Sequence, residues 1–171
     1  MKNSMITKFS FFTLVFAMVA MLSLAQDDKP SPARTAEGEI NGAKITINYS
    51  SPAVKGRVIW GDLVPLGQVW RAGANDATTF ETSKDIKIEG QTLPAGKYSL
   101  FIIPNEGESI LIFNKVAKQW GAYSYDESQD ALRVKIPSNL GSSLEERLVY
   151  EVKPDGVEMR WEYASSFAKI E

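Results

Sequence analysis

The amino-acid sequence predicts an all-β fold, a single antiparallel β-sandwich or barrel-like domain. Three observations predict it. Apolar and polar residues alternate over short segments, turn residues separate these segments at a spacing of about ten residues, and no long window keeps an apolar stripe at helical spacing. The chain has 171 residues, of which 44% are hydrophobic and 23% are charged, as is usual for one globular domain.

The first 25 residues have the pattern of a signal peptide. Two lysines precede an unbroken apolar run of nine residues, Leu14–Leu22, which is too short to cross a bilayer. Ser23 and Ala25 then supply the small residues of a cleavage site before Gln26. An uncleaved membrane anchor is the alternative, but polar residues follow at once. We therefore expect residues 1–25 to be removed and the mature protein to be periplasmic or secreted, with no stable membrane span.

The elements expected after the cleavage site are strands. Residues 26–34 are polar and contain prolines, so we expect a flexible lead-in before a β-rich domain of residues 35–171. Residues 44–49 and 85–89 alternate strictly between apolar and polar side chains. Because successive side chains of a strand point to opposite faces, this pattern predicts two half-buried strands.

The next two expected strands differ, because residues 98–103 and 110–113 are apolar on both faces. We expect them to be central strands that are covered on both sides and joined by a hairpin loop at Pro104–Gly107.

The last third of the chain alternates again, which predicts strands at residues 132–136, 148–152 and 157–163, with a turn at Lys153–Gly156 between the last two. Together the strands predict a core led by twelve apolar residues. They are Ile45, Ile47, Tyr98, Leu100, Ile102, Ile110, Ile112, Leu132, Val134, Val157, Met159 and Trp161.

The composition excludes several classes of chemistry. The chain contains no cysteine and no histidine, so it has no disulfide, no thiol nucleophile, no Ser-His-Asp triad and no thiolate or imidazole metal ligand. The formal net charge of −2 gives no basic footprint for nucleic acid. We expect no metal, no cofactor and no nucleic-acid partner.

The alternation stops between Ser51 and Thr79. The part from Lys55 to Thr79, called the irregular segment below, contains two tryptophans, three cations and four glycines. Long irregular segments are uncommon in compact domains and often carry function. An arginine can hold two oxygens of a carboxylate or phosphate while a tryptophan stacks on a sugar ring. The candidate ligand-binding residues are Lys55, Arg57, Trp60, Trp70, Arg71, Asn75, Asp76 and Trp120.

A packed loop is the alternative interpretation of this segment. Trp60 and Trp70 would then fill one end of the core, and Arg71 would pair with Asp76. Residues 120–126 form a second aromatic cluster, which is either part of the core or the second wall of a sugar-binding site.

Long motifs in the chain resemble a known family. These motifs are YSSPAVKGRVIWGDLVPLGQVWRAGANDATT, LPAGKYSLFIIP, IFNKVAKQWGAYSYD and DALRVKIP. They are similar to DUF2911, a domain of unknown function found mostly in exported bacterial proteins, notably of Bacteroidetes. The resemblance runs from about Ser31 to the C-terminus, and it implies an exported β-rich domain without an assigned activity.

Three functions remain open. The first is a cell-envelope binding module that holds a small anionic or sugar-like ligand through the irregular segment. The second is a structural or assembly partner of an envelope protein complex. The third is a carboxylate-based hydrolase that uses two of Asp62, Asp76 and Glu81, for which the separation of the two groups is decisive.

Overall fold

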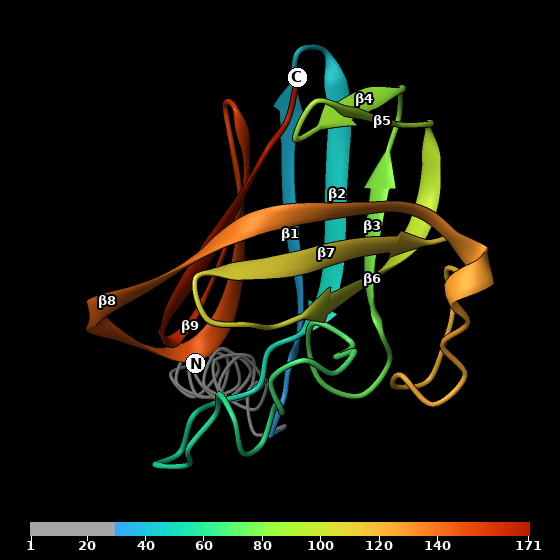
Figure 1. The fold of residues 1–171 in the computed structure, drawn as a ribbon. Coiled ribbons are helices and arrows are strands. Elements are labelled where there is room, and N and C mark those ends of the chain that lie inside the picture. Colours follow the sequence, from blue (N-terminus) through green and yellow to red (C-terminus); the bar gives the residue numbers. More distant parts are fainter. Residues whose placement is uncertain (1–29) are drawn as a thin grey trace, which may run out of the picture.

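The computed structural model describes residues 30–171, and these form an almost entirely β structure (Figure 1). The strands are β1 (Ala33–Ile40), β2 (Ala43–Ser50), β3 (Thr78–Thr82), β4 (Ile86–Ile88), β5 (Gln91–Leu93), β6 (Gly96–Ile103), β7 (Glu108–Asn114), β8 (Asp130–Lys153) and β9 (Gly156–Lys169). A short 3-10 helix, Glu127–Gln129, precedes β8. The expected signal peptide lies outside the described residues.

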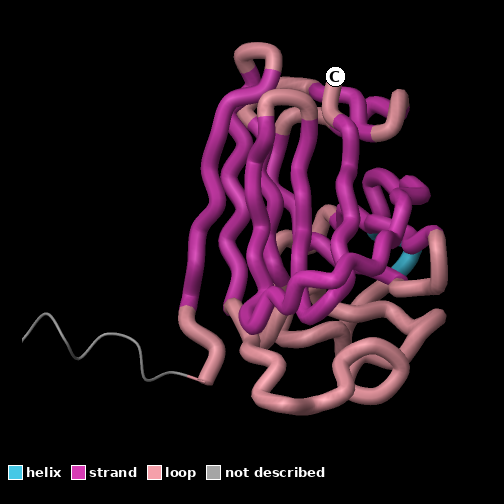
Figure 2. The backbone as a smooth tube through the Cα atoms, turned by 90° about the vertical axis from the view of Figure 1, so that its left-hand side faces the viewer, coloured by secondary structure: helices cyan, strands magenta, loops and turns pink. Residues whose placement is uncertain are grey.

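Seven strands form one antiparallel sheet in the order β1-β2-β3-β6-β7-β8-β9. The sheet curls on itself into a nearly closed barrel, so the expected all-β, barrel-like fold is confirmed (Figure 2). The small β4–β5 hairpin lies at one end of the barrel, and the loops of the irregular segment gather at the other end (Figure 1).

The barrel closes where the second half of β8 approaches β1 and the residues after β2. The backbone amide of Val54 donates to the carbonyl of Glu146 at 2.8 Å. On β1, a Cβ atom added to Gly38 would lie only 2.6 Å from Cγ1 of Val152. A side chain at position 38 would therefore push β8 away, so a glycine is needed for this close approach.

Two tight turns and one loop determine the registers of the hairpins. The loops expected at Pro104–Gly107 and Lys153–Gly156 are confirmed, since they join β6 to β7 and β8 to β9. A third turn, Asn41–Gly42, joins β1 to β2, and both of its residues have positive φ angles, 51° and 78°. These angles are those of a type I′ turn, whose twist matches that of the two strands.

Strand β1 begins inside the expected lead-in. Ala33 and Arg34 pair with Ser50 and Tyr49 of β2, so ladder hydrogen bonding starts two residues before the expected domain boundary at residue 35.

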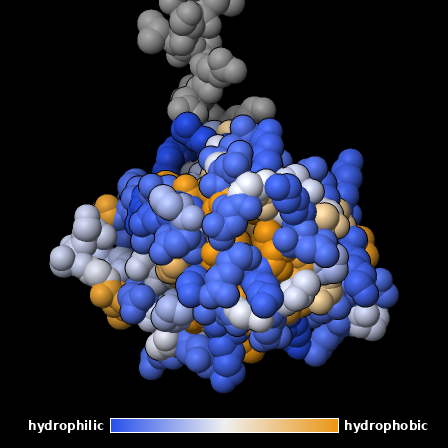
Figure 3. All heavy atoms as spheres, turned by 90° about the horizontal axis from the view of Figure 1, so that it is seen from above, coloured by the Kyte–Doolittle hydropathy of each residue, from blue (hydrophilic) through white to orange (hydrophobic). Residues whose placement is uncertain are grey.

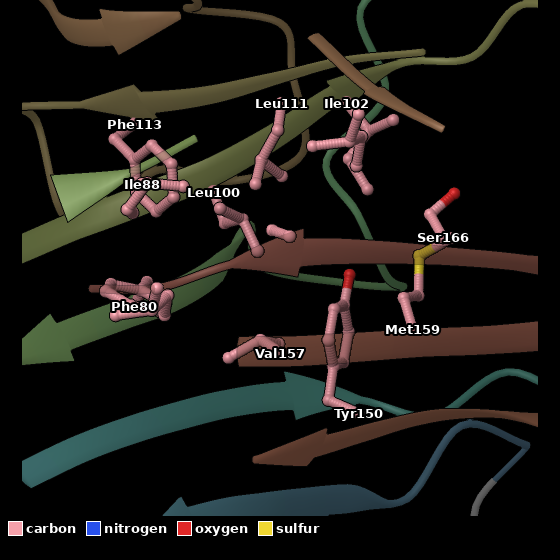
Figure 4. Close-up of a pocket in the computed structure, with 13 residues that line it drawn as sticks. Phe80, Ile88, Leu100, Ile102, Leu111, Phe113, Tyr150, Val157, Met159 and Ser166 are labelled. Atoms are coloured by element: carbon pink, nitrogen blue, oxygen red, sulfur yellow. The ribbon is translucent and has the colours of Figure 1, made fainter. Parts of the chain in front are cut away.

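The interior of the barrel is a packed apolar core. Eleven of the twelve expected core residues are buried, ten of them in this interior and Ile112 in a second cluster, against which the partly buried Ile110 packs. The interior leaves a cavity of about 20 Å³, close to the volume that one water requires (Figure 4).

Strands β6 and β7 are covered on both faces, as their apolar sequences predict. One face packs in the barrel interior. On the other face Phe101, Ile112 and Ala77 of the irregular segment form a second buried cluster. Val69 of the same segment and Tyr125 pack against it. The irregular segment therefore wraps over the end of the barrel onto its outer surface.

Seen from the β4–β5 end, the surface is largely hydrophilic, with small apolar areas between the polar side chains (Figure 3). Among residues 30–171, no helix is long and apolar enough to cross a membrane. The same residues contain no group of three or more side chains that could hold a metal ion.

Candidate functional site

The inner side of the irregular segment closes one end of the barrel with indole rings. Trp70 is 8% exposed and stacks on Trp161 of β9, with ring centroids 5.7 Å apart and an interplanar angle of 17°. Trp60 meets both rings edge-on, at 5.7 Å from Trp70 and 5.9 Å from Trp161. Such aromatic pairs stabilise a fold beyond the area that they bury. For Trp70, burial and stacking match the packed-loop interpretation.

The backbone at Trp70 pairs with β6 like a short strand. The amide of Trp70 donates to the carbonyl of Ile102 at 2.8 Å, and the amide of Ile102 donates back at 2.9 Å. Side chains on either side of such a pair point in opposite directions. Trp70 therefore enters the core, while Val69 and Arg71 face outward.

Arg71 lines a hollow of about 360 Å³ on the outer side, called the Arg71 hollow below. Its walls are residues 63–65 and 68–70 of the irregular segment and Ala122 and Tyr123 of the second aromatic cluster. Tyr123 is 87% exposed, so its ring is open to a ligand.

The guanidinium of Arg71 has no partner among the described residues. Arg71 is partly buried, its Nε atom is enclosed without a hydrogen-bond partner, and no ion pair includes it. Asp76, its expected partner in the packed-loop interpretation, does not pair with it. A partly buried charge without a partner is costly, and an oxygen from outside the protein would relieve that cost.

The second aromatic cluster is held by a buried polar network. Gln119 is 7% exposed, and its Nε2 donates to Oδ1 of Asn114 at 3.1 Å. Tyr125 donates to Oδ2 of Asp130 at 2.6 Å. Burial, together with this hydrogen bond, raises the pKa of the Tyr125 hydroxyl above its usual range. These bonds fix the wall of the Arg71 hollow that residues 122–123 provide.

A family model matches residues 31–170, and its description is a protein of unknown function, DUF2911. The chain belongs to the DUF2911 family. No curated protein and no solved structure matches it. The resemblance described from the sequence motifs is thus confirmed, and the function of this DUF2911 protein has to be inferred from its geometry.

The cations at the start of the irregular segment lie elsewhere in this DUF2911 domain. Lys55 is exposed in a turn, and its own backbone amide donates to Oε1 of Glu146 at 2.9 Å. The guanidinium of Arg57 donates to the carbonyls of Ala53 and Val54. Arg57 therefore stabilises its own turn.

The end of the segment is tied to the second aromatic cluster. Asp76 forms an isolated β-bridge with Trp120, and the carbonyl of Asn75 accepts a hydrogen bond from the amide of Gly121 at 3.2 Å. Trp120 is 64% exposed, and Asp76 lines a separate hollow of about 270 Å³ beside Lys97.

The eight candidate residues do not line one common hollow. Trp70 and Arg71 line the Arg71 hollow, Trp60 lines a cavity beside β8, and Asp76 lines a third hollow. The remaining four lie in none of these three hollows. They are Lys55, Arg57, Asn75 and Trp120.

Sequence reasoning missed Gln68, which lines the Arg71 hollow. It included Tyr123 only as a member of the second aromatic cluster. The signal that points to both is proximity to Arg71, which depends on the folded backbone.

Proposed function

We propose that this DUF2911 protein is an exported binding module for a small, anionic, sugar-like ligand, and that the acidic group of the ligand binds Arg71. The observation that carries the proposal is the partly buried guanidinium without a protein partner. Arginine presents its donors in a planar fork that matches two oxygens of a carboxylate or phosphate. A salt bridge of this kind would satisfy the buried Nε group.

The walls of the Arg71 hollow suit the rest of such a ligand. The ring of Tyr123 offers an exposed aromatic face against which a sugar ring can pack. The amide of Gln68 offers both a donor and an acceptor to sugar hydroxyls. No carboxylate lines this hollow, so an anion entering it meets no like charge from the lining residues.

A titration of charged and neutral sugars tests the proposal. Glucuronate, galacturonate and glucose 6-phosphate, each compared with glucose, should raise the melting temperature or release heat on binding, whereas glucose should not. Arg71→Met keeps the apolar part of the side chain and removes the charge, so it should weaken binding at least about tenfold.

Lys55→Gln is the matched control, because it removes an exposed cation of the same segment outside the hollow. Its affinity for the anion should equal that of the wild type. Equal affinities of the wild type and Arg71→Met would contradict the proposal, and so would the absence of binding by every anion of this series.

A structural partner of an envelope complex is the second candidate, favoured by exposed apolar side chains on the irregular segment. Val58, Leu63 and Leu66 are 61%, 46% and 41% exposed. Val58 and Leu63 are adjacent, since the amide of Leu63 donates to the carbonyl of Val58 at 3.3 Å, and adjacent exposed apolar side chains can mark a protein contact. If they bind a partner, Val58→Ser with Leu66→Ser should abolish cross-linking to that partner in cells and leave anion binding unchanged, because neither residue lines the Arg71 hollow.

A hydrolase is not favoured by the arrangement of the carboxylates. Glu81 pairs with Lys97 at 3.5 Å and lines none of the three hollows, Asp76 lines the hollow beside that lysine without a second carboxylate in its lining, and Asp62 is exposed on the irregular segment. Acid and base catalysis on a glycosidic bond requires two carboxyl groups facing one substrate.

A further inference from the structure

A second cavity lies beside β8, and it shares no lining residue with the Arg71 hollow. This β8 cavity has a volume of about 650 Å³, which is within the range of about 300–1,000 Å³ typical of small-molecule sites. Its walls are the β6–β7 loop (residues 104–107), residues 138–140 of β8, and Trp60 and Leu66 of the irregular segment.

The floor of the β8 cavity is the apolar interior of the barrel. Ile102, Met159 and Ser166 line both the β8 cavity and the small interior cavity (Figure 4). At the rim, Leu140 is 83% exposed and Leu66 is 41% exposed. Apolar side chains thus extend from the solvent to the core, so the apolar part of a ligand would be in contact with protein throughout.

One hydroxyl that lines this cavity has no partner among the described residues. Ser166 is 6% exposed, and its hydroxyl forms no hydrogen bond with any described residue. Figure 4 shows this hydroxyl at the same end of the interior cavity as Met159. A ligand hydroxyl can bond to this group, and the indole N–H of Trp60, which is buried without a partner, offers a further donor among the lining residues.

Apart from Glu106, the remaining polar groups of the wall are neutral. Ser109 and Ser138 share a hydrogen bond of 2.6 Å, and Asn105 and Asn139 add amides. Glu106 is the one charged residue among those that line the cavity. An anionic ligand would find no cation there and would be repelled by Glu106, whereas hydroxyl groups would find donors and acceptors.

We propose that the β8 cavity is a separate binding site for an uncharged amphipathic molecule with an apolar chain and a hydroxyl group. The chain packs against Trp60, Ile102 and Met159, and the hydroxyl bonds to Ser166. The site differs in chemistry from the Arg71 hollow, since it selects against the negative charge that the Arg71 hollow selects for.

Two probes of the same chain length test this site, 1-octanol and octanoate. Octanol should produce a saturable change in the fluorescence of Trp60, one of the lining residues, and saturable NMR shifts at Ser166 and Met159. Octanoate at neutral pH should produce these changes at least tenfold more weakly. The Arg71→Met variant should bind octanol like the wild type. The octanol result therefore stands even if the Arg71 hollow proves to bind no anion.

Neighbouring serines on β9 provide the matched variants. Ser166→Ala should weaken octanol binding about threefold to tenfold, the effect of one lost hydrogen bond. Ser165→Ala should have no effect, because Ser165 does not line the cavity. Leu140→Asp changes an exposed rim residue without disturbing the core, and it should also weaken octanol binding.

Three results would overturn the proposal. They are the absence of a saturable change with octanol, equal affinities for octanol and octanoate in the Arg71→Met protein, and equal effects of Ser165→Ala and Ser166→Ala.

Discussion

Trp70 and Arg71 are adjacent in the chain, but they belong to two different regions of the molecule. On the inner side of the irregular segment, Trp70 stacks on Trp161 and is 8% exposed. On the outer side, the guanidinium of Arg71 lies in an open hollow without a partner. The packed-loop and the ligand-site interpretations therefore each describe one side of the same segment, and mutations on the two sides should affect different properties.

The inner side should give the largest effect on stability. Trp161→Ala removes a ring that is 1% exposed and that contacts two other indoles, so we expect a loss of about 3–5 kcal/mol in the free energy of unfolding. Urea denaturation measures it. Trp120→Ala, in which a ring that is 64% exposed is removed, should cost less than about 0.5 kcal/mol. Similar losses in the two variants would contradict the assignment of Trp161 to the group of three indole rings that closes one end of the barrel.

The close approach of β1 to β8 is a second place where packing closes the barrel, and a substitution at Gly38 tests it. Gly38→Val would place its Cβ atom 2.6 Å from Val152, so we expect a loss of about 1–3 kcal/mol. Gly141→Ala is the control, because its nearest neighbour is 3.8 Å away. If both variants were as stable as the wild type in urea, the close approach of β1 and β8 would be wrong.

Arg160 contrasts with Arg71, because its guanidinium has ion-pair partners in the protein. It contacts Glu145, Glu151 and Glu158. Arg160→Ala should cost about 1 kcal/mol at neutral pH, because several partly exposed charges share one arginine.

The effect of Arg160→Ala should depend on pH. A hydrogen bond from Lys153, and then one from Arg160, holds the pKa of Glu158 below its ordinary value of 4.5. The stabilisation is present above that value and is lost as the pH falls through the lower pKa of the folded state. The stabilities of the wild type and Arg160→Ala should therefore converge in acid, as measured by denaturation between neutral pH and pH values below 4.5. A difference that does not change with pH would contradict this interpretation.

The strands could be predicted from the sequence because a strand with one buried face leaves a period of two. This pattern identified β2, both ends of β8 and the first half of β9, whereas the central strands β6 and β7 were predicted because they are apolar on both faces. Strand β1 was missed, since residues 33–40 are mostly small or polar and largely exposed. The dipeptide Asn41-Gly42, which is typical of a type I′ turn, was the signal that could have revealed it.

The candidate site could be predicted only in part. Its unusual residues are visible in the sequence, but the side of the segment to which each one points is not. That direction follows from the pairing of Trp70 with Ile102, and no local pattern encodes this contact between residues far apart in the chain. For the same reason the sequence could not show that Arg57 is not a ligand-binding residue of this hollow. Its guanidinium donates to carbonyls of its own turn instead.

The most direct test measures stability and binding on one variant, Arg71→Met. If Arg71 serves a ligand, the free energy of unfolding should stay within about 0.5 kcal/mol of the wild type, because no acid loses its partner, and the affinity for the anionic sugar should fall at least about tenfold. A loss of about 3 kcal/mol in stability, together with unchanged affinity, would instead show that the guanidinium belongs to the fold.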